Sequence, residues 1–238
     1  MDFLRRLFRT PFEDNVERFY AVVDKYGYGE VPAREVYATF EGIASPVLGG
    51  FSIIKPGVFA RPVNIDIVHV LKLQARKGGA YTVCWGACLT YLPQVRGGRL
   101  RWPRTLKSAN LDLWEDPFEY FGSGNEGRGV SDRYFAQNGH GAQYLRETMT
   151  EMWSVINDPV QSWFRATEDL TSVLNKIEEQ QKRKWRGPRH LPDPQIIRAF
   201  TLHRLARTGD ARLAFDEYVA REGVPTTDAD LLRAALDI

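Results

Sequence analysis

The stretch of residues 63–92 constrains the fold of this chain more than any other part of the sequence. It holds two long runs rich in β-branched and aromatic residues, separated by the sequence Arg-Lys-Gly-Gly at 76–79. Apolar side chains recur at every second position in both runs, which is the period of a β-strand. A Gly-Gly pair between two such runs is typical of a tight turn between antiparallel strands. The sequence therefore predicts a long central β-hairpin.

The two faces of this hairpin differ in polarity. The opposite face of the first strand becomes polar toward the turn, because it carries, in order, Asp66, Val68, Val70, Lys72, Gln74 and Arg76. His69 lies among the apolar residues, so we weigh a buried histidine held by one neighbour against a catalytic base. The apolar face is predicted to carry Ile65, Ile67, His69, Leu71, Leu73 and Ala75 from the first strand and Tyr81, Val83, Trp85, Ala87, Leu89 and Tyr91 from the second.

The rest of the chain is predicted to supply shorter strands and several helices. Short strands are expected at 51–54 and 58–61, and edge strands at 100–102 and 111–114. Spacings of three and four residues between apolar positions predict helices before the hairpin and throughout the second half of the chain. The sequence Asn157-Asp158-Pro159 is expected to break one of these helices, and Thr167 to cap the next.

These elements define a fold class and a domain division. We predict an α+β fold in which an antiparallel sheet, built on the central long hairpin, is packed by helices and followed by a small C-terminal helical module. The expected division is an α+β domain at 1–180, a basic linker at 181–191 and a small three-helix module at 192–238. Residues 115–141 show no sustained period and are expected to form a long loop.

Composition limits the compartment and the partners. The chain has 32 basic and 30 acidic residues, a formal net charge of +2, so nucleic-acid binding would need a local basic patch. Cys84 and Cys88 would lie about 13 Å apart on one strand, too far for a disulfide, and are expected to be buried thiols in a reducing compartment. No apolar run approaches the roughly 18 residues of a membrane span, so we expect a cytoplasmic protein.

No catalytic motif stands out. Residues 122–127 match G-x-G-x-x-G, but no buried strand precedes them and no helical pattern follows, which favours a loop over a dinucleotide site. His140 lies between glycines without a partner motif. Asp66 and Lys72 resemble an acid–lysine nuclease pair, yet the second carboxylate for a metal ion is missing. We therefore expect no catalytic residues, no cofactor and no metal site, and lean toward a non-enzymatic protein.

Two groups of residues are candidates for binding. The first is aromatic and surrounds the edge strands and the long loop, where it would serve either a protein-binding surface or ordinary packing. The second is a basic cluster around one tryptophan, which allows phosphate contacts and base stacking but also fits a solvated linker. The protein-binding candidates are Trp102, Trp114, Phe118, Tyr120 and Phe121, and the nucleic-acid-binding candidates are Lys182, Arg183, Lys184, Trp185, Arg186 and Arg189.

Two segments resemble a family of uncharacterised bacterial proteins. The first, at 59–68, is an aromatic–arginine segment that leads into the hairpin, whose second strand carries Trp85-Gly86 and ends at Tyr91-Leu92-Pro93. The second, at 159–170, places an aromatic pair before a Thr-capped helix. The resemblance covers roughly residues 40–180, implies a bacterial α+β domain of unknown function, and carries over no catalytic residue.

The leading hypothesis is a cytoplasmic protein-interaction module whose sheet and long loop bind another protein. A role in bacterial immunity or defence would fit it by association. The alternative is a nucleic-acid-binding protein, or a metal-dependent nuclease, that uses the basic cluster at 182–190.

Overall fold

The computed structural model describes residues 20–117, 132–182 and 193–237. Its centre is a six-stranded antiparallel sheet in the order β1-β2-β3-β4-β7, with β8 paired to β4. A separate two-stranded sheet joins β5 to β6. The strands are β1 (Ser52–Lys55), β2 (Val58–Pro62), β3 (Ile67–Ala75), β4 (Ala80–Leu89), β5 (Gln94–Val95), β6 (Leu100–Arg101), β7 (Leu113–Glu115) and β8 (Ala136–Gln137).

Helices precede and follow this sheet, which makes the fold α+β with a C-terminal helical part, as predicted. Residues 20–26 end a first helix at Gly27, whose positive φ of 76° stops it. The other α-helices among the described residues are α3 (Ala33–Ala44), α5 (Gly141–Arg165), α6 (Leu170–Lys182), α7 (Pro194–Arg204), α8 (Thr208–Glu222) and α9 (Thr226–Leu236). Short 3-10 turns lie at η1 (Ser45–Val47), η2 (Lys77–Gly79), η3 (Leu106–Ser108) and η4 (Asp132–Tyr134).

The predicted central hairpin is confirmed. Strands β3 and β4 pair without interruption from Ile67↔Leu89 to Ala75↔Tyr81. The turn between them uses Gly78 and Gly79, whose φ angles of 75° and 74° lie in the left-handed region that favours glycine. The pairing puts the alternate apolar residues of both strands on one face, as the sequence pattern predicted.

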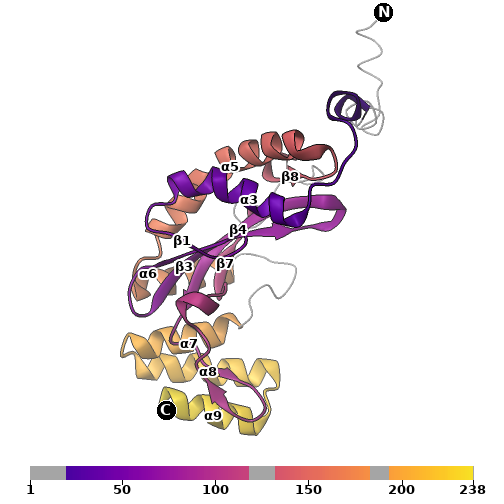
Figure 1. Cartoon of the computed structure of the whole chain (residues 1–238). Coiled ribbons are helices and arrows are strands. Elements are labelled where there is room, and N and C mark those ends of the chain that lie inside the picture. Colours follow the sequence, from indigo (N-terminus) through magenta and orange to yellow (C-terminus); the bar gives the residue numbers. More distant parts are fainter. Residues whose placement is uncertain (1–19, 118–131, 183–192, 238) are drawn as a thin grey trace, which may run out of the picture.

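That face is covered by α3, α5 and α6, which lie along one side of the sheet (Figure 1). Phe40 of α3 packs edge-to-face against Phe59 of β2 and Trp153 of α5, with ring centroids 5.8 Å apart in both pairs. The C-terminal helices join the same buried cluster, because Phe200 of α7 and Phe215 of α8 belong to it. The buried hydroxyl pair of Tyr91 and Thr201, 2.7 Å apart, links the end of the hairpin to α7.

The opposite face of the sheet is apolar over most of its length and polar toward the turn, as the residue pattern predicted. Val68, Val70 and Cys88 are buried there in a second, smaller cluster with Ala60 and Ala109. The segment that follows β6 supplies Ala109 and so covers this part of the face. The polarity expected from Lys72 onward is confined to the end of β3 near the turn, where Lys72 is exposed.

Several local predictions were wrong for identifiable reasons. Helix α5 continues through Pro159, because Ile156, Val160 and Trp163 lie on one buried face and hold both halves in register. Thr167 does not cap α6. Its hydroxyl donates to the Trp163 carbonyl, 3.0 Å away, and the Asp169 carboxylate accepts from the Ser172 amide instead.

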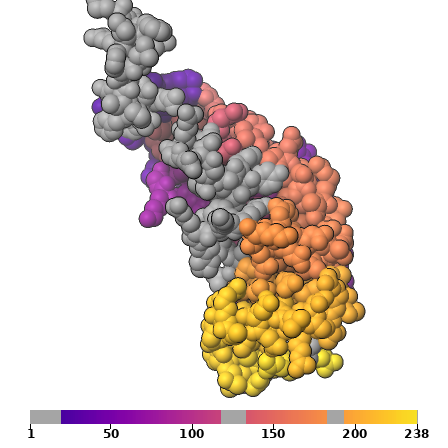
Figure 2. Space-filling view, turned by 180° about the vertical axis from the view of Figure 1, so that it is seen from behind, coloured from indigo at the N-terminus to yellow at the C-terminus, as the bar shows by residue number. Residues whose placement is uncertain are grey.

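Two boundaries in the second half of the sheet and in the helical part also differ. Residues 100–102 do not extend the main sheet, since β6 pairs only with β5. Helix α7 was expected to end near Gly209, but it ends at Arg204, and Ala206 just after it has a positive φ of 58°. Gly209 lies in the first turn of α8. Seen from behind, α7, α8 and α9 form a rounded lobe at one end of an elongated molecule (Figure 2).

Candidate functional site

The β5–β6 hairpin is the element on which the candidate site is built. Its turn is Gly97-Gly98, with φ angles of 60° and 65°, and the Arg96 amide donates to the Arg99 carbonyl at 3.0 Å. Two glycines with positive φ are what a tight two-residue hairpin turn requires. The pairs Gln94↔Arg101 and Val95↔Leu100 then fix which side chains share a face.

The two faces of this hairpin have opposite character. Val95 and Leu100 face inward and pack against the main core. Because successive side chains of a strand point to opposite faces, the residues before and after Val95 and Leu100 lie on the other face of the hairpin, which is exposed. That outer face carries Gln94, Arg96, Arg99 and Arg101, and the exposed Trp102 follows directly.

A buried ion pair fixes the position of the chain that carries the hairpin. The Arg104 guanidinium donates to both carboxylate oxygens of Asp112 at 2.7–2.9 Å and to the Leu92 carbonyl at 2.7 Å. Asp112 also accepts from the Leu89 amide at 2.9 Å. Burial raises the pKa of Asp112, and the hydrogen bonds and charge of Arg104 act against that rise. The pair ties both ends of the hairpin segment to the end of β4.

A pocket of about 220 Å³ lies between the hairpin and the C-terminal helices. Six of its nine lining residues are apolar and three, Gln94, Tyr218 and Asp228, are polar, so that polar and apolar atoms share its surface about equally. Burial raises the pKa of the Tyr218 hydroxyl, and the negative charge of Asp193 adds to the effect. The apolar lining residues are Leu92, Pro93, Val95, Ile196, Val224 and Leu232.

The predicted aromatic candidates do not lie in one strand or one sheet. Trp102 follows the β5–β6 hairpin and is 52% exposed. Trp114 lies in β7 of the main sheet opposite Gly86, where it is half-buried. Phe118, Tyr120 and Phe121 fall outside the described residues.

The predicted basic cluster is described only at its first residue. Lys182 is the last residue of α6 and is exposed. Arg183, Lys184, Trp185, Arg186 and Arg189 fall outside the described residues, as does the G-x-G-x-x-G sequence at 122–127. Their role in binding nucleic acid stays a prediction.

His69 is fully buried and serves the packing of the sheet against α5. The Arg61 guanidinium donates to Nδ1 at 3.1 Å, which leaves the proton on Nε2, 3.1 Å from the Thr167 carbonyl. The ring stacks on Phe164 with centroids 4.7 Å apart. Burial lowers the pKa of His69 to about 4, so the ring is neutral at pH 7. Of the two interpretations left open by the sequence, this geometry favours the buried histidine.

The other titratable candidates are engaged in local contacts. Asp66 accepts from Arg204 of α7 at 2.8 Å and so helps attach the C-terminal helices to the sheet. His140 lies 5.2 Å from the Tyr144 ring, with Nδ1 3.2 Å from the Gly27 carbonyl. Cys84 and Cys88 are buried thiols that form no disulfide with each other, and the Cys84 thiol donates to Gln74 at 2.8 Å. Within 20–117, 132–182 and 193–237, no three His, Cys, Asp or Glu side chains are grouped to hold a metal ion.

Sequence reasoning missed the arginines of the β5–β6 hairpin. The signal is present as Arg-Gly-Gly-Arg-Leu-Arg-Trp at 96–102, a glycine turn flanked by cations. It was missed because two-residue strands leave almost no alternating pattern to detect. The pocket left no signal, because its lining comes from residues more than one hundred positions apart in the chain.

Comparisons with protein-family models, with curated proteins and with solved structures found no match to this chain. The resemblance to a bacterial family therefore stays a prediction. In the part of the chain that the structure describes, no helix is both long and apolar enough to cross a membrane.

Proposed function

We propose that this chain is a protein-binding module, and that a side chain of the partner protein enters the pocket between the β5–β6 hairpin and the C-terminal helices. The observation that carries this proposal is the pocket's lining. Six apolar side chains, from the hairpin segment, from α7, from α9 and from the turn before α9, converge on one open cavity. Apolar surface gathered in a concave site is a common feature of interaction surfaces.

The size of the pocket suits a side chain better than a metabolite. A volume of about 220 Å³ is below the roughly 300–1,000 Å³ typical of small-molecule sites. It exceeds the roughly 150 Å³ of an engineered apolar cavity that holds benzene. A phenyl or branched aliphatic side chain therefore fits, and its burial would contribute about 1.5–3 kcal/mol to binding.

The polar part of the lining adds a preference. Asp228 is a half-buried carboxylate beside the apolar surface, and Gln94 offers both a donor and an acceptor. A partner segment with an apolar anchor next to a lysine or arginine would satisfy both features. An immunity or defence role and a cytoplasmic location remain expectations from the sequence.

The test is recovery of a partner from the native host with two matched variants. Val224→Phe puts a ring into the pocket, whereas Leu213→Phe adds the same group on α8 at a side chain that is 65% exposed and does not line the pocket. Tagged wild type and both variants are retrieved after nuclease treatment, and bound proteins are quantified by mass spectrometry. We expect one protein with wild type and Leu213→Phe, reduced about 10-fold or more with Val224→Phe.

Equal recovery with all three proteins would show that the pocket is not the binding site. Recovery that disappears on nuclease treatment would favour the nucleic-acid alternative instead.

A further inference from the structure

We propose that the outer face of the β5–β6 hairpin binds single-stranded nucleic acid, with Arg96, Arg99 and Arg101 on the phosphates and Trp102 stacked on a base. This site goes beyond the protein-binding proposal and does not depend on it. Its three arginines do not line the pocket, although Gln94 on the same face does. It is also separate from the basic cluster predicted at 182–190.

The first argument is an uncompensated concentration of positive charge. Arg96 and Arg99 are directly opposite across the turn, and Arg101 lies on the same face two pairs further along. Like charges directly opposite one another destabilise a strand pair. The cost is not offset within the part of the chain that the structure describes, where none of these three guanidinium groups has an ion-pair partner. Binding an anion would remove this destabilisation by neutralising the arginines.

Several arginines elsewhere on this end of the molecule, though not Arg212, contrast with the three on the hairpin. On the C-terminal helices, Arg204 pairs with Asp66, Arg221 with Asp193 and Arg233 with Asp216. Two acids also belong to the hairpin region, but neither lies on the hairpin itself. Asp112 is buried against Arg104, and Asp228 lines the pocket from α9.

The second argument is an exposed indole that directly follows Arg101 in the chain. Trp102 is 52% exposed, although a tryptophan usually buries most of its ring. Cations combined with a flat aromatic surface are typical of sites for single strands, where phosphates pair with the cations and unpaired bases stack. A base in a duplex has no free face for such stacking, and an acidic protein segment would use the arginines but not the ring.

The third argument is that the site is held in place before binding. The glycine turn fixes the two strands, Val95 and Leu100 pack inward, and the Arg104–Asp112 pair anchors the chain just after Trp102. A preorganised surface loses less entropy on binding than a free basic tail.

The test is fluorescence anisotropy of labelled 20-nucleotide oligo(dT) and oligo(U) with the full chain. Three phosphate contacts predict a slope of log K against log salt of about −2, or roughly a 20-fold weakening between 50 and 200 mM salt. Arg96/Arg99/Arg101→Gln should abolish most of this slope. Trp102→Ala should weaken binding about 5- to 100-fold.

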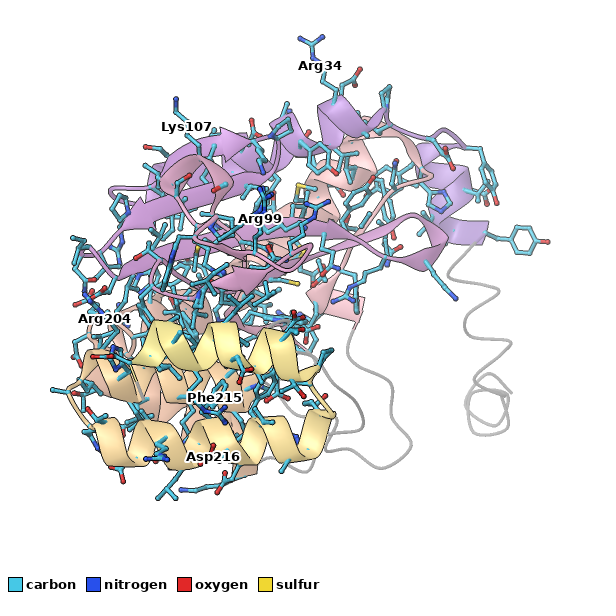
Figure 3. All side chains as sticks on the ribbon, turned by 90° about the horizontal axis from the view of Figure 1, so that it is seen from below. Arg34, Arg99, Lys107, Arg204, Phe215 and Asp216 are labelled. Atoms are coloured by element: carbon cyan, nitrogen blue, oxygen red, sulfur yellow. The ribbon has the colours of Figure 1, made fainter. Side chains whose placement is uncertain are left out.

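A charge-matched control is available on other surfaces. Arg34, Arg146 and Arg212 are exposed on α3, α5 and α8 and form no ion pair with described residues, and Arg34 points outward in Figure 3. Replacing these three with Gln changes the net charge equally and should leave binding within about 2-fold of wild type.

Three results would overturn the inference. The first is no binding by wild type at 50 mM salt. The second is binding lost with Lys182/Arg183/Lys184→Gln but kept in the hairpin variant, which would move the site to the basic cluster. The third is equal binding of a labelled 20-residue polyglutamate peptide without any effect of Trp102→Ala, which would identify an acidic protein as the ligand.

Discussion

Replacing Arg104 with Met removes the cation that neutralises a buried carboxylate. The Asp112 side chain is 1% exposed and that of Arg104 is 12% exposed, and three hydrogen bonds of 2.7–2.9 Å join them. The substitution keeps an apolar stem of similar length but leaves the Asp112 charge with only weaker, neutral partners, the Leu89 amide and the Cys88 thiol. It also removes the donor to the Leu92 carbonyl.

The expected cost follows from this burial. Removing one partner of a buried pair typically costs about 3–5 kcal/mol, because the remaining charge is desolvated without compensation. The double variant Arg104→Met/Asp112→Asn has no buried charge and keeps an acceptor for the Leu89 amide. Its loss of stability should therefore be smaller, about 1–2 kcal/mol, since it mainly loses neutral hydrogen bonds.

The pH dependence provides a second readout with a defined sign. Burial raises the pKa of Asp112 and Arg104 opposes this effect, so the pKa rises further in Arg104→Met. A carboxyl group with a raised pKa in the folded state stabilises the fold at low pH and loses that contribution as pH increases. The deficit of Arg104→Met should therefore be largest near pH 7, shrink as pH falls through the raised pKa of the folded state, and be smallest at about pH 4, the usual pKa of an unfolded aspartate.

The assay is urea unfolding of wild type and the two variants, followed by tryptophan fluorescence at pH 7 and at pH 4. A single variant less than about 1 kcal/mol below wild type, or a double variant less stable than the single one, would refute the argument that this pair anchors the hairpin segment.

Three further predictions concern the sheet and α5. A Cβ at Gly86 would overlap the Leu113 carbonyl and lie 2.7 Å from Trp114 Cα, so Gly86→Ala should lower the free energy of unfolding by about 1–3 kcal/mol. Gly42→Ala, at an exposed position of α3, should be neutral or stabilising, and equal effects of the two substitutions in thermal melts would contradict this prediction. His69 has a pKa of about 4 in the folded state against about 6.5 in the unfolded state, so the free energy of unfolding should fall by up to about 3 kcal/mol as pH decreases from 6.5 to 4. In urea titrations, His69→Gln should reduce this dependence of stability on pH, and an unchanged dependence would rule out His69 as its cause. Pro159→Ala restores an amide donor inside α5 and should raise the free energy of unfolding by up to about 3 kcal/mol, and a loss in the same assay would show that the proline ring is needed for packing.

The sequence was sufficient for the sheet because its longest strands are also its most regular. Alternation over nine and ten residues in β3 and β4, with Gly78 and Gly79 between them, leaves little choice of pairing. The same local logic failed at Pro159, where the burial of side chains on both sides outweighs the missing hydrogen bond. It also missed β8, whose two residues form a strand only because β4 is beside them.

The candidate site was less accessible to such reasoning. Trp102 was identified from its type, and its exposure is consistent with a binding role. Arg96, Arg99 and Arg101 form one face of the β5–β6 hairpin only because of the way in which residues 94–101 pair. The pocket depends on how α7 and α9 pack against that hairpin. Both are tertiary properties, so a pattern along one segment carries no record of them.

The most direct test of the protein-binding account is a photo-crosslinking amino acid at Gln94, incorporated in the native host. Gln94 is exposed and lines the pocket, so a bound partner should lie within reach of the probe. The account predicts a discrete adduct that protease removes, that nuclease leaves intact, and that Val224→Phe abolishes. An adduct that survives Val224→Phe, or one that only nuclease removes, would contradict it.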